Sequence, residues 1–141
     1  MSTEENKRLV ERFYDHLRAG TIGNTTDIVT PDCIRHDPSG REDPGPSAFA
    51  ARVRRTEGAF SDLVSTPNIV IAEGDKVAVR WTITARHTGP RDGFPATGRN
   101  VTFSGVNIFR IENGRIAEIW NHRDDLSVLQ QIGAVTLPFG P

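Results

Sequence analysis

Alternation of apolar and polar residues predicts three consecutive β-strands in the second half of the chain. Apolar side chains occupy alternate positions of residues 77–85, and the same period of two recurs in residues 101–111 and 116–122. Because successive side chains of a strand point to opposite faces of a sheet, each segment has one mainly apolar face. The dipeptide Asn113-Gly114, between the last two segments, is typical of a tight hairpin turn. We therefore expect an antiparallel meander with one face buried.

Two asparagines lie on the mainly apolar faces of these strands. Asn107 shares its face with Phe103 and Phe109, and Asn121 shares its face with Ile119. A buried amide that lacks hydrogen-bond partners costs about 1–3 kcal/mol. Both amides are therefore expected to have specific partners, which makes them candidates for a functional site.

A helix is predicted near the N-terminus. Ser2 and Glu5 have the spacing of a capping box, and Gly20 ends the helical pattern. Apolar residues recur at helical intervals between these limits, and Phe13 and Leu17 lie on the inward side.

Turn residues and periodicity predict the remaining elements. We expect a short helix over residues 26–29 and an amphipathic helix that begins near Pro46, because proline suits a first helical turn. A strand over residues 66–72 is expected to pair with the strand that begins at Val77. A final helical turn or two is expected over residues 126–132.

This order of elements predicts the fold class. Helices followed by a run of antiparallel strands are typical of an α+β protein. So few strands bury both sets of apolar faces only if the sheet curves over the helices. The predicted fold is therefore a curved, mostly antiparallel sheet wrapped around the N-terminal helices. It forms a cone-shaped barrel with an internal pocket, which suits a small apolar ligand.

Composition narrows the class of protein. The 141 residues suit a single domain, residues 1–141, and the formal net charge is −1. This balance lacks the positive charge typical of nucleic-acid or anionic-membrane partners, and no segment reaches transmembrane length. The single cysteine, Cys33, rules out an internal disulfide, and no apolar leader is present. We expect a cytoplasmic protein.

Several common catalytic motifs do not occur in the sequence. The four histidines have no close metal-ligand spacing, so no metal site is expected. The GxSxG, P-loop and GxGxxG motifs are also missing, which argues against acyl-serine, nucleotide and dinucleotide chemistry. No cofactor is expected. Cys33 is interpreted as a small buried residue rather than a catalytic thiol.

A carboxylate remains as a candidate for catalysis. Asp37 lies where an extended segment enters a loop, and it would act as a general base if the pocket raised its pKa. An equally good interpretation is a turn residue whose carboxylate binds the following backbone. His36 is a candidate proton shuttle, an orienting partner or a hydrogen-bonded core residue. Asp124 or Asp125 is expected to cap the last helix.

Several runs of residues resemble a known family. AEGDKVAVRWTITARHTG, GFPATGR, FRIENGRIAEIWN and LQQIG, with RFYDHLRAG and PDCIRHDP, resemble the SnoaL-like polyketide cyclase family. The resemblance implies the cone fold shared with ketosteroid isomerase and scytalone dehydratase. It also implies homo-oligomers, either dimers or tetramers, and cofactor-free chemistry on small apolar or polycyclic molecules of secondary metabolism. The founding activity is an intramolecular aldol ring closure, in which an aspartate removes a proton next to a carbonyl and a histidine assists.

The catalytic pair of the family differs in this sequence. The resemblance places the aspartate at Asn121 and the histidine at Asn107. An asparagine cannot act as a general base, because its amide is essentially non-basic. The likeness of RHDP to ketosteroid isomerase implies instead that Asp37 is the base. It also implies that Asn107 donates to the substrate oxygen and that Phe13 holds the place of an assisting tyrosine.

These residues combine into one hypothesis. The protein moves a proton next to a carbonyl, as a cyclase, isomerase or dehydratase, with Asp37 as the base and His36 assisting. Asn107 and Asn121 donate hydrogen bonds to the developing oxyanion. Arg35 is assigned to substrate binding. The predicted walls of the pocket are Phe13, Phe60, Trp81 and Phe103.

Two other interpretations remain open at this point. A non-catalytic family member, with a ligand-binding or structural role, would also lack both cyclase residues. An epoxide hydrolase or hydratase would require an Asp–Arg–Asp cluster around a water, of which Arg35 and Asp37 supply a part.

Overall fold

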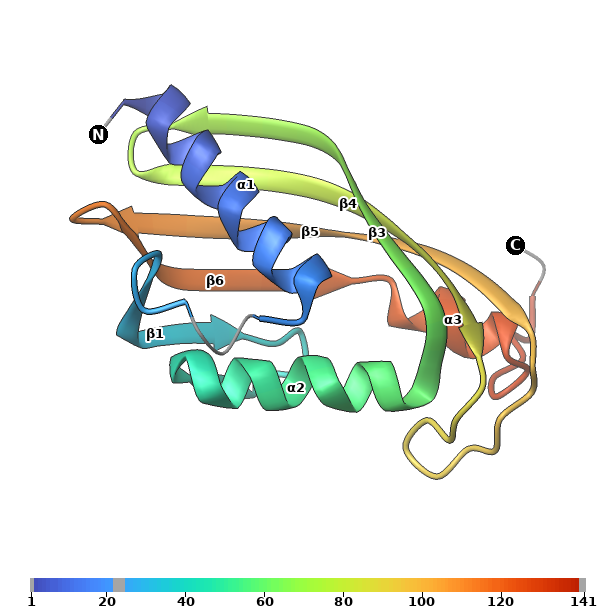
Figure 1. The fold of residues 1–141 in the computed structure, drawn as a ribbon. Helices are drawn as coiled ribbons and strands as arrows, with labels where there is room; N and C mark the ends of the chain where they lie inside the picture. Colours follow the sequence, from blue (N-terminus) through green and yellow to red (C-terminus); the bar gives the residue numbers. More distant parts are fainter. Residues whose placement is uncertain (1, 22–24, 140–141) are drawn as a thin grey trace.

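The structure, a computed structural model, describes residues 2–21 and 25–139 apart from the side chain of residue 49. A six-stranded sheet carries α1 and α2 on one face, and α3 lies at one end of the sheet (Figure 1). None of the helices in the described part of the chain is long and apolar enough to cross a membrane. The elements are α1 (Thr3–Ala19), β1 (Val29–His36), β2 (Glu42–Pro44), α2 (Gly45–Ala59), β3 (Phe60–Glu73), β4 (Lys76–His87), β5 (Asn100–Glu112), β6 (Arg115–Arg123) and α3 (Asp125–Gln131).

The sheet has the strand order β2-β1-β6-β5-β4-β3. β1 runs parallel to β6, and all the other neighbouring strands are antiparallel. The sheet curves around the two helices and stays open, because β2 and β3 are its edges (Figure 1). The predicted α+β class, with a curved and mostly antiparallel sheet, is confirmed.

The apolar faces of the meander form the core. Val77, Val79 and Phe109 are completely buried under α1. The ring of Phe109 meets Phe13 and Tyr14 edge-on, with centroids 5.3 and 5.9 Å apart. Such edge-to-face pairs add to the free energy gained by burial, so this contact fixes α1 on the sheet.

Both ends of α1 follow the prediction. The Ser2 side chain accepts a hydrogen bond from the backbone N–H of Glu5 at 3.1 Å, which satisfies one of the free donors of the first turn. Gly20 adopts the left-handed conformation, with φ 73°, as the C-cap.

The predicted helix over residues 26–29 is wrong. Residues 26–28 form a turn, and β1 begins at Val29, which pairs with Ile116 of β6. The β-branched residues in this stretch favour a strand over a helix.

β3 is longer than the strand predicted over residues 66–72, because it begins directly after α2 at Phe60. It contains Pro67, which has no N–H to donate to a neighbouring strand. The proline is accommodated because β3 is an edge strand, and the register shifts between Pro67 and Ile69.

Candidate active site

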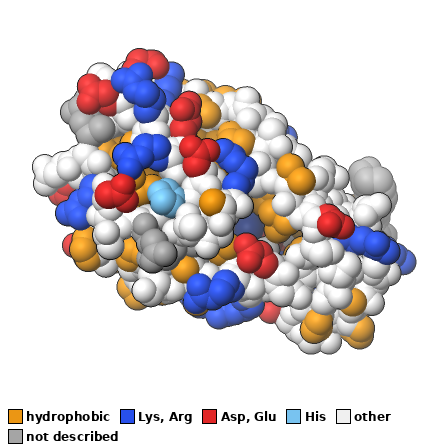
Figure 2. Space-filling model, in the orientation of Figure 1, with side chains coloured by type: hydrophobic (Ala, Val, Ile, Leu, Met, Phe, Trp, Pro, Cys, Tyr) orange, Lys and Arg blue, Asp and Glu red, His pale blue; other side chains and the backbone are white. Residues whose placement is uncertain are grey.

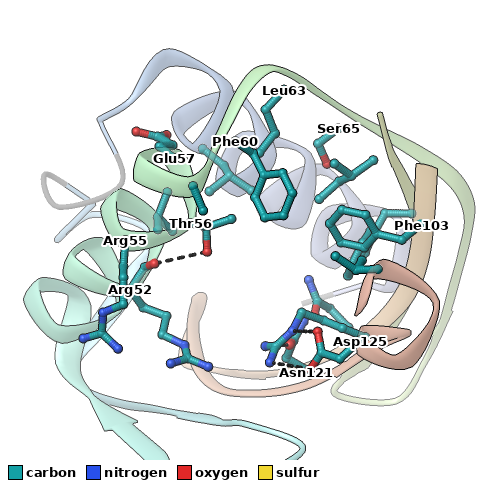
Figure 3. A pocket seen from close by; sticks show the side chains of 18 of the residues that line it. Arg52, Arg55, Thr56, Glu57, Phe60, Leu63, Ser65, Phe103, Asn121 and Asp125 are labelled. Atoms are coloured by element: carbon teal, nitrogen blue, oxygen red, sulfur yellow. Dashed lines mark hydrogen bonds and ion pairs between the residues drawn. The ribbon is translucent and has the colours of Figure 1, made fainter. Parts of the chain in front are cut away.

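A cavity of about 660 Å³ lies between the inner face of the sheet and the three helices. Phe60, Leu63 and Phe103 form one side of it, and polar residues including Asn121 and Asp125 form the opposite side (Figure 3). The aromatic residues predicted as pocket walls all line the cavity: Phe13, Phe60, Trp81 and Phe103.

Two neighbouring strands bring Asn107 and Asn121 together. The residues are direct partners across β5 and β6, and both side chains line the cavity. Asn121 Nδ2 donates to Asn107 Oδ1 at 2.6 Å, and Asn107 Nδ2 donates to the hydroxyl of Tyr14 at 2.9 Å. The two strands and α1 thus supply one continuous chain of hydrogen bonds, which we call the amide relay (Asn121, Asn107 and Tyr14).

Two arginines determine the direction of the amide relay. Asn121 Oδ1 accepts from Arg35 Nη2 at 2.8 Å and from Arg123 Nη1 at 2.7 Å. Because a guanidinium can only donate, the Asn121 oxygen faces the arginines and its nitrogen faces Asn107. The Asn107 oxygen then accepts, so its nitrogen turns toward Tyr14.

The amide relay leaves donors available to a ligand. Each amide nitrogen carries two hydrogens, and one of them is used between Asn121 and Asn107 or between Asn107 and Tyr14. Burial raises the pKa of Tyr14, and the hydrogen bond from Asn107 offsets only part of that rise. The phenol is therefore neutral and keeps its own hydrogen to donate.

The structure does not favour Asp37 as a general base. Its Oδ1 accepts from Arg52 at 2.7 Å and from Arg123 at 2.8 Å, and Arg35 lies 3.4 Å away. Its Oδ2 accepts from the backbone and the side chain of Ser39 at 3.0 and 2.7 Å. Asp37 is therefore the shared counter-ion of three arginines as well as a turn residue, and it is not among the residues that line the cavity.

The electrostatics of Asp37 lead to the same conclusion. Burial raises its pKa, but the hydrogen bonds from Arg123 and Ser39 outweigh this effect and hold the pKa well below its ordinary value. A general base works best when its pKa lies near the working pH. The condition for Asp37 to act as a base, a pKa raised by the pocket, is not met, because its surroundings supply cations rather than apolar groups.

His36 lies on the opposite face of the sheet from Arg35, as strand alternation requires. Its Nε2 is 2.6 Å from Glu118 Oε2, and its ring stacks on Trp120 at a centroid distance of 5.4 Å. His36 is not among the cavity-lining residues, whereas Arg35 is. Instead of the expected partnership with Asp37 at the active site, His36 contacts Glu118 on the outer face of the sheet.

Asp125 is a carboxylate that does reach the cavity. It accepts from Arg123 Nε and Nη2, both at 3.1 Å, and from Arg91 at 3.4 Å. Its neighbour Asp124 caps α3 by accepting from the N–H of Ser127 at 3.1 Å, as predicted for one of the pair. Arg123 donates to both Asn121 and Asp125, so it holds this carboxylate beside the amide relay.

Three important residues of the site were missed from the sequence. Tyr14, rather than Phe13, supplies the hydroxyl on α1, and it belongs to the same apolar stripe as Val10. Arg123 lies two positions after Asn121 on β6, so strand alternation places it on the same face. The sequence indicates Asp125 only as a candidate helix cap.

The chain is similar to known proteins of one family. The family model for SnoaL-like polyketide cyclases matches residues 7–132. The aklanonic acid methyl ester cyclase DnrD of Streptomyces peucetius is 30% identical over 139 residues, covering 94% of this chain and 92% of that protein. The nogalonic acid methyl ester cyclase of Streptomyces nogalater is 31% identical over 90 residues, covering 63% of this chain and 67% of that protein. The structure of TsrD from Streptomyces laurentii matches with a TM-score of 0.82 and 29% identity, over 96% of this chain and 99% of that one. The chain belongs to the SnoaL-like polyketide cyclase family.

Proposed function

We propose that the protein is a cofactor-independent enzyme that forms an enolate from a polyketide-type ketone and closes a ring with it. The observation that carries this proposal is the amide relay at the polar side of an aromatic-lined cavity. The cyclases among its relatives support the reaction class.

The amide relay suits the stabilisation of an enolate oxygen. The unused N–H groups of Asn107 and Asn121 are held in place by Arg35 and Arg123 before any ligand binds. Donors that need no reorganisation during the reaction stabilise developing negative charge most effectively. The two guanidinium groups also withdraw electron density from Asn121 Oδ1, which makes the Asn121 N–H a stronger donor.

We assign the proton transfer to Asp125, which is also paired with arginines but, unlike Asp37, lines the cavity beside the amide relay. The carboxylate would take the proton from the carbon next to the substrate carbonyl, and the C–H electron pair would form the enolate. The enolate carbon would then attack a second carbonyl carbon of the same molecule, forming one C–C bond and an alkoxide. The protonated Asp125 would return the proton to that alkoxide, so the reaction rearranges one molecule without an oxidant or reductant.

Proton exchange tests this assignment without the authentic substrate. A 1,3-diketone fused to an aromatic ring is incubated in deuterium oxide, and the loss of its α-proton is followed by NMR. We expect the wild-type protein to accelerate exchange and Asp125→Asn to lose about 10²-fold or more of that acceleration. The matched control is Asp62→Asn, because Asp62 is an exposed carboxylate that also lines the cavity. Unchanged exchange in Asp125→Asn would remove Asp125 from the mechanism.

A non-catalytic ligand-binding protein is the second candidate. The observation that favours it is the pair Asn107 and Asn121, which stands where the family resemblance expects a histidine and an aspartate. In that case the diketone would bind with no acceleration of exchange by the wild-type protein.

Epoxide opening has less support. The structure supplies an Asp–Arg–Asp arrangement, since Arg35 lies 3.4 Å from Asp37 and 3.2 Å from Asp43. Neither carboxylate is among the residues that line the cavity, so neither is placed to activate a water beside a ligand.

Self-association and a cytoplasmic location belong to the same proposal. Val106 is 37% exposed on the outer face of the sheet, which supports contact with a second copy there. Light scattering after size-exclusion chromatography would distinguish the expected dimer or tetramer from a monomer.

A further inference from the structure

An ion-pair network with an excess of positive charge lies beside the cavity. In the described part of the chain it joins five arginines to three aspartates through contacts of 2.7–3.4 Å. The network thus has two more cations than anions. Its members are Arg35, Arg41, Arg52, Arg91, Arg123, Asp37, Asp43 and Asp125.

The network is centred on buried side chains, and its other arginines are partly exposed, between 18% for Arg123 and 46% for Arg41. The side chains of Arg35, Asp37 and Asp43 are only 7%, 2% and 2% exposed. On the face shown in Figure 2, Lys and Arg side chains are interspersed with Asp and Glu side chains. Because partly buried charges are screened less than fully exposed ones, the excess attracts an anionic ligand that enters the cavity.

Four of the five cations of the network line the cavity, Arg41 being the exception, whereas two of its three anions, Asp37 and Asp43, do not. Arg52 reaches in from α2 and Arg123 from β6, and both bind the same oxygen of Asp37. Figure 3 shows Arg52 and Arg55 on one side of the cavity and Asn121 on the other. Burial and the nearby Arg123 lower the pKa of Arg35, the direction expected where positive charge is in excess.

Two buried N–H donors near the cavity lack an acceptor. Arg91 Nη1 and Trp81 Nε1 have no hydrogen-bond partner among the described residues, and both side chains line the cavity. A buried donor without an acceptor destabilises the folded chain by about 1–3 kcal/mol. A ligand oxygen that accepted a hydrogen bond from one of these donors would remove that penalty.

We propose that the cavity selects ligands that carry a carboxylate, and that the protein acts on a free aromatic acid rather than on its methyl ester. The inference rests on the proposed function, in that the cavity is taken as the substrate site. The carboxylate would lie between Arg52 and Arg123, since a guanidinium matches the two oxygens of a carboxylate in geometry and charge.

Asn121 distinguishes the charge of this cavity from that of a family member with an aspartate at the same position. An aspartate at this position, as the family resemblance expects, would place a negative charge beside Arg35 and Arg123 and cancel part of the excess. The neutral amide accepts the same two hydrogen bonds without supplying that charge. The two cyclases named above act on methyl esters, as their names state, so a preference for the free acid would distinguish this protein from them.

Binding measurements with a matched pair of probes test the proposal. Anthraquinone-2-carboxylate and its methyl ester have the same ring system and differ in one charge. We expect titration calorimetry at pH 7 to give a dissociation constant about tenfold or more lower for the acid. The preference should shrink as salt is raised, because salt screens the attraction.

Two variants locate the effect. Arg52→Gln should weaken binding of the acid about tenfold and leave binding of the ester unchanged. Asn121→Asp should reduce or remove the preference, because the new carboxylate would cancel part of the excess positive charge. Arg54→Gln is the matched control, since Arg54 is an exposed residue of α2 that does not line the cavity. Thermal melting followed by circular dichroism verifies that each variant is folded.

The outcomes separate the two proposals. If the acid and the ester bind equally, or the ester binds more tightly, selection of carboxylates is excluded while the proposed function stands. If neither probe binds to the folded protein, the cavity is not a site for such ligands and both proposals fail.

Discussion

Asn107 and Asn121 face each other across β5 and β6, and the side-chain Nδ2 of Asn121 donates to the side-chain Oδ1 of Asn107 at 2.6 Å. Arg35 and Arg123 both donate to the side-chain oxygen of Asn121. They therefore fix the orientation of the Asn121 amide and, through it, that of the Asn107 amide. The site is therefore a directed chain of donors that starts at two cations and ends at the neutral phenol of Tyr14.

Replacing Asn107 with leucine should separate catalysis from binding. The variant removes one donor to the enolate, and loss of one such donor typically lowers kcat about 10²- to 10³-fold. Ligand affinity should change far less, because the cavity walls and the arginines remain. Steady-state kinetics and titration calorimetry on the same preparation provide the measurement.

Asn68→Leu is the control for that variant. Asn68 is an exposed amide on β3 that accepts from Arg80 and Thr82, away from the cavity. An equal loss of kcat in both variants would point to a general effect on the sheet rather than to the amide relay.

Asp37→Asn should destabilise the fold. The carboxylate is 2% exposed and balances three arginines. Breaking a buried ion pair by removing one partner typically costs about 3–5 kcal/mol, because the other charge stays buried. Urea denaturation at pH 7 gives the free energy of unfolding. A variant that kept its stability but lost all proton exchange would restore Asp37 as the catalytic base.

The contribution of Asp37 to stability should depend on pH. The folded pKa lies below the ordinary value, so the unfolded chain binds a proton first as the pH falls. The stabilisation is complete above the unfolded pKa of about 4 and declines by up to about 1.4 kcal/mol per pH unit below it. The difference in unfolding free energy between wild type and Asp37→Asn should therefore be larger at pH 7 than at pH 3.

Asp27→Asn is the matched comparison for the pH series. Asp27 forms an exposed ion pair with Arg12, and such pairs contribute little. A gap between wild type and Asp37→Asn that stayed constant from pH 7 to pH 3 would contradict the ionic role of Asp37.

Local patterns predicted the meander but not the ion-pair network. The period of two in residues 101–111 placed Asn107 on the buried face, because strand geometry alone fixes that alternation. The contacts of Asp37 with Arg123 and of Arg35 with Asn121 each join residues 86 positions apart. They depend on the parallel pairing of β1 with β6, which no local pattern indicates.

Adjacent residues account for the other errors. Arg35 and His36 must lie on opposite faces of β1, but the sequence of this short strand does not show which of them faces inward. Phe13 and Tyr14 are both buried on α1, so the helical period admits either of them to the site. What identifies Tyr14 as the site residue is the hydrogen bond that its hydroxyl accepts from Asn107 on β5.

Gly105→Ala should reshape the cavity through Trp81. The two residues are partners across β4 and β5, and a β-carbon at Gly105 would collide with the indole ring and with the backbone oxygen of His122. Because Trp81 lines the cavity, the ring can yield only by moving into it or by displacing the strand. We expect a loss of about 1–3 kcal/mol in unfolding free energy from overpacking, together with weaker binding of the anthraquinone probes.

Gly58→Ala is the control. A β-carbon at Gly58 on α2 meets nothing within 4 Å, so this variant should stabilise the helix by up to about 1 kcal/mol. Urea denaturation and calorimetry on both variants would show whether the small residue at position 105 keeps the cavity open; unchanged probe binding in Gly105→Ala would show that it does not.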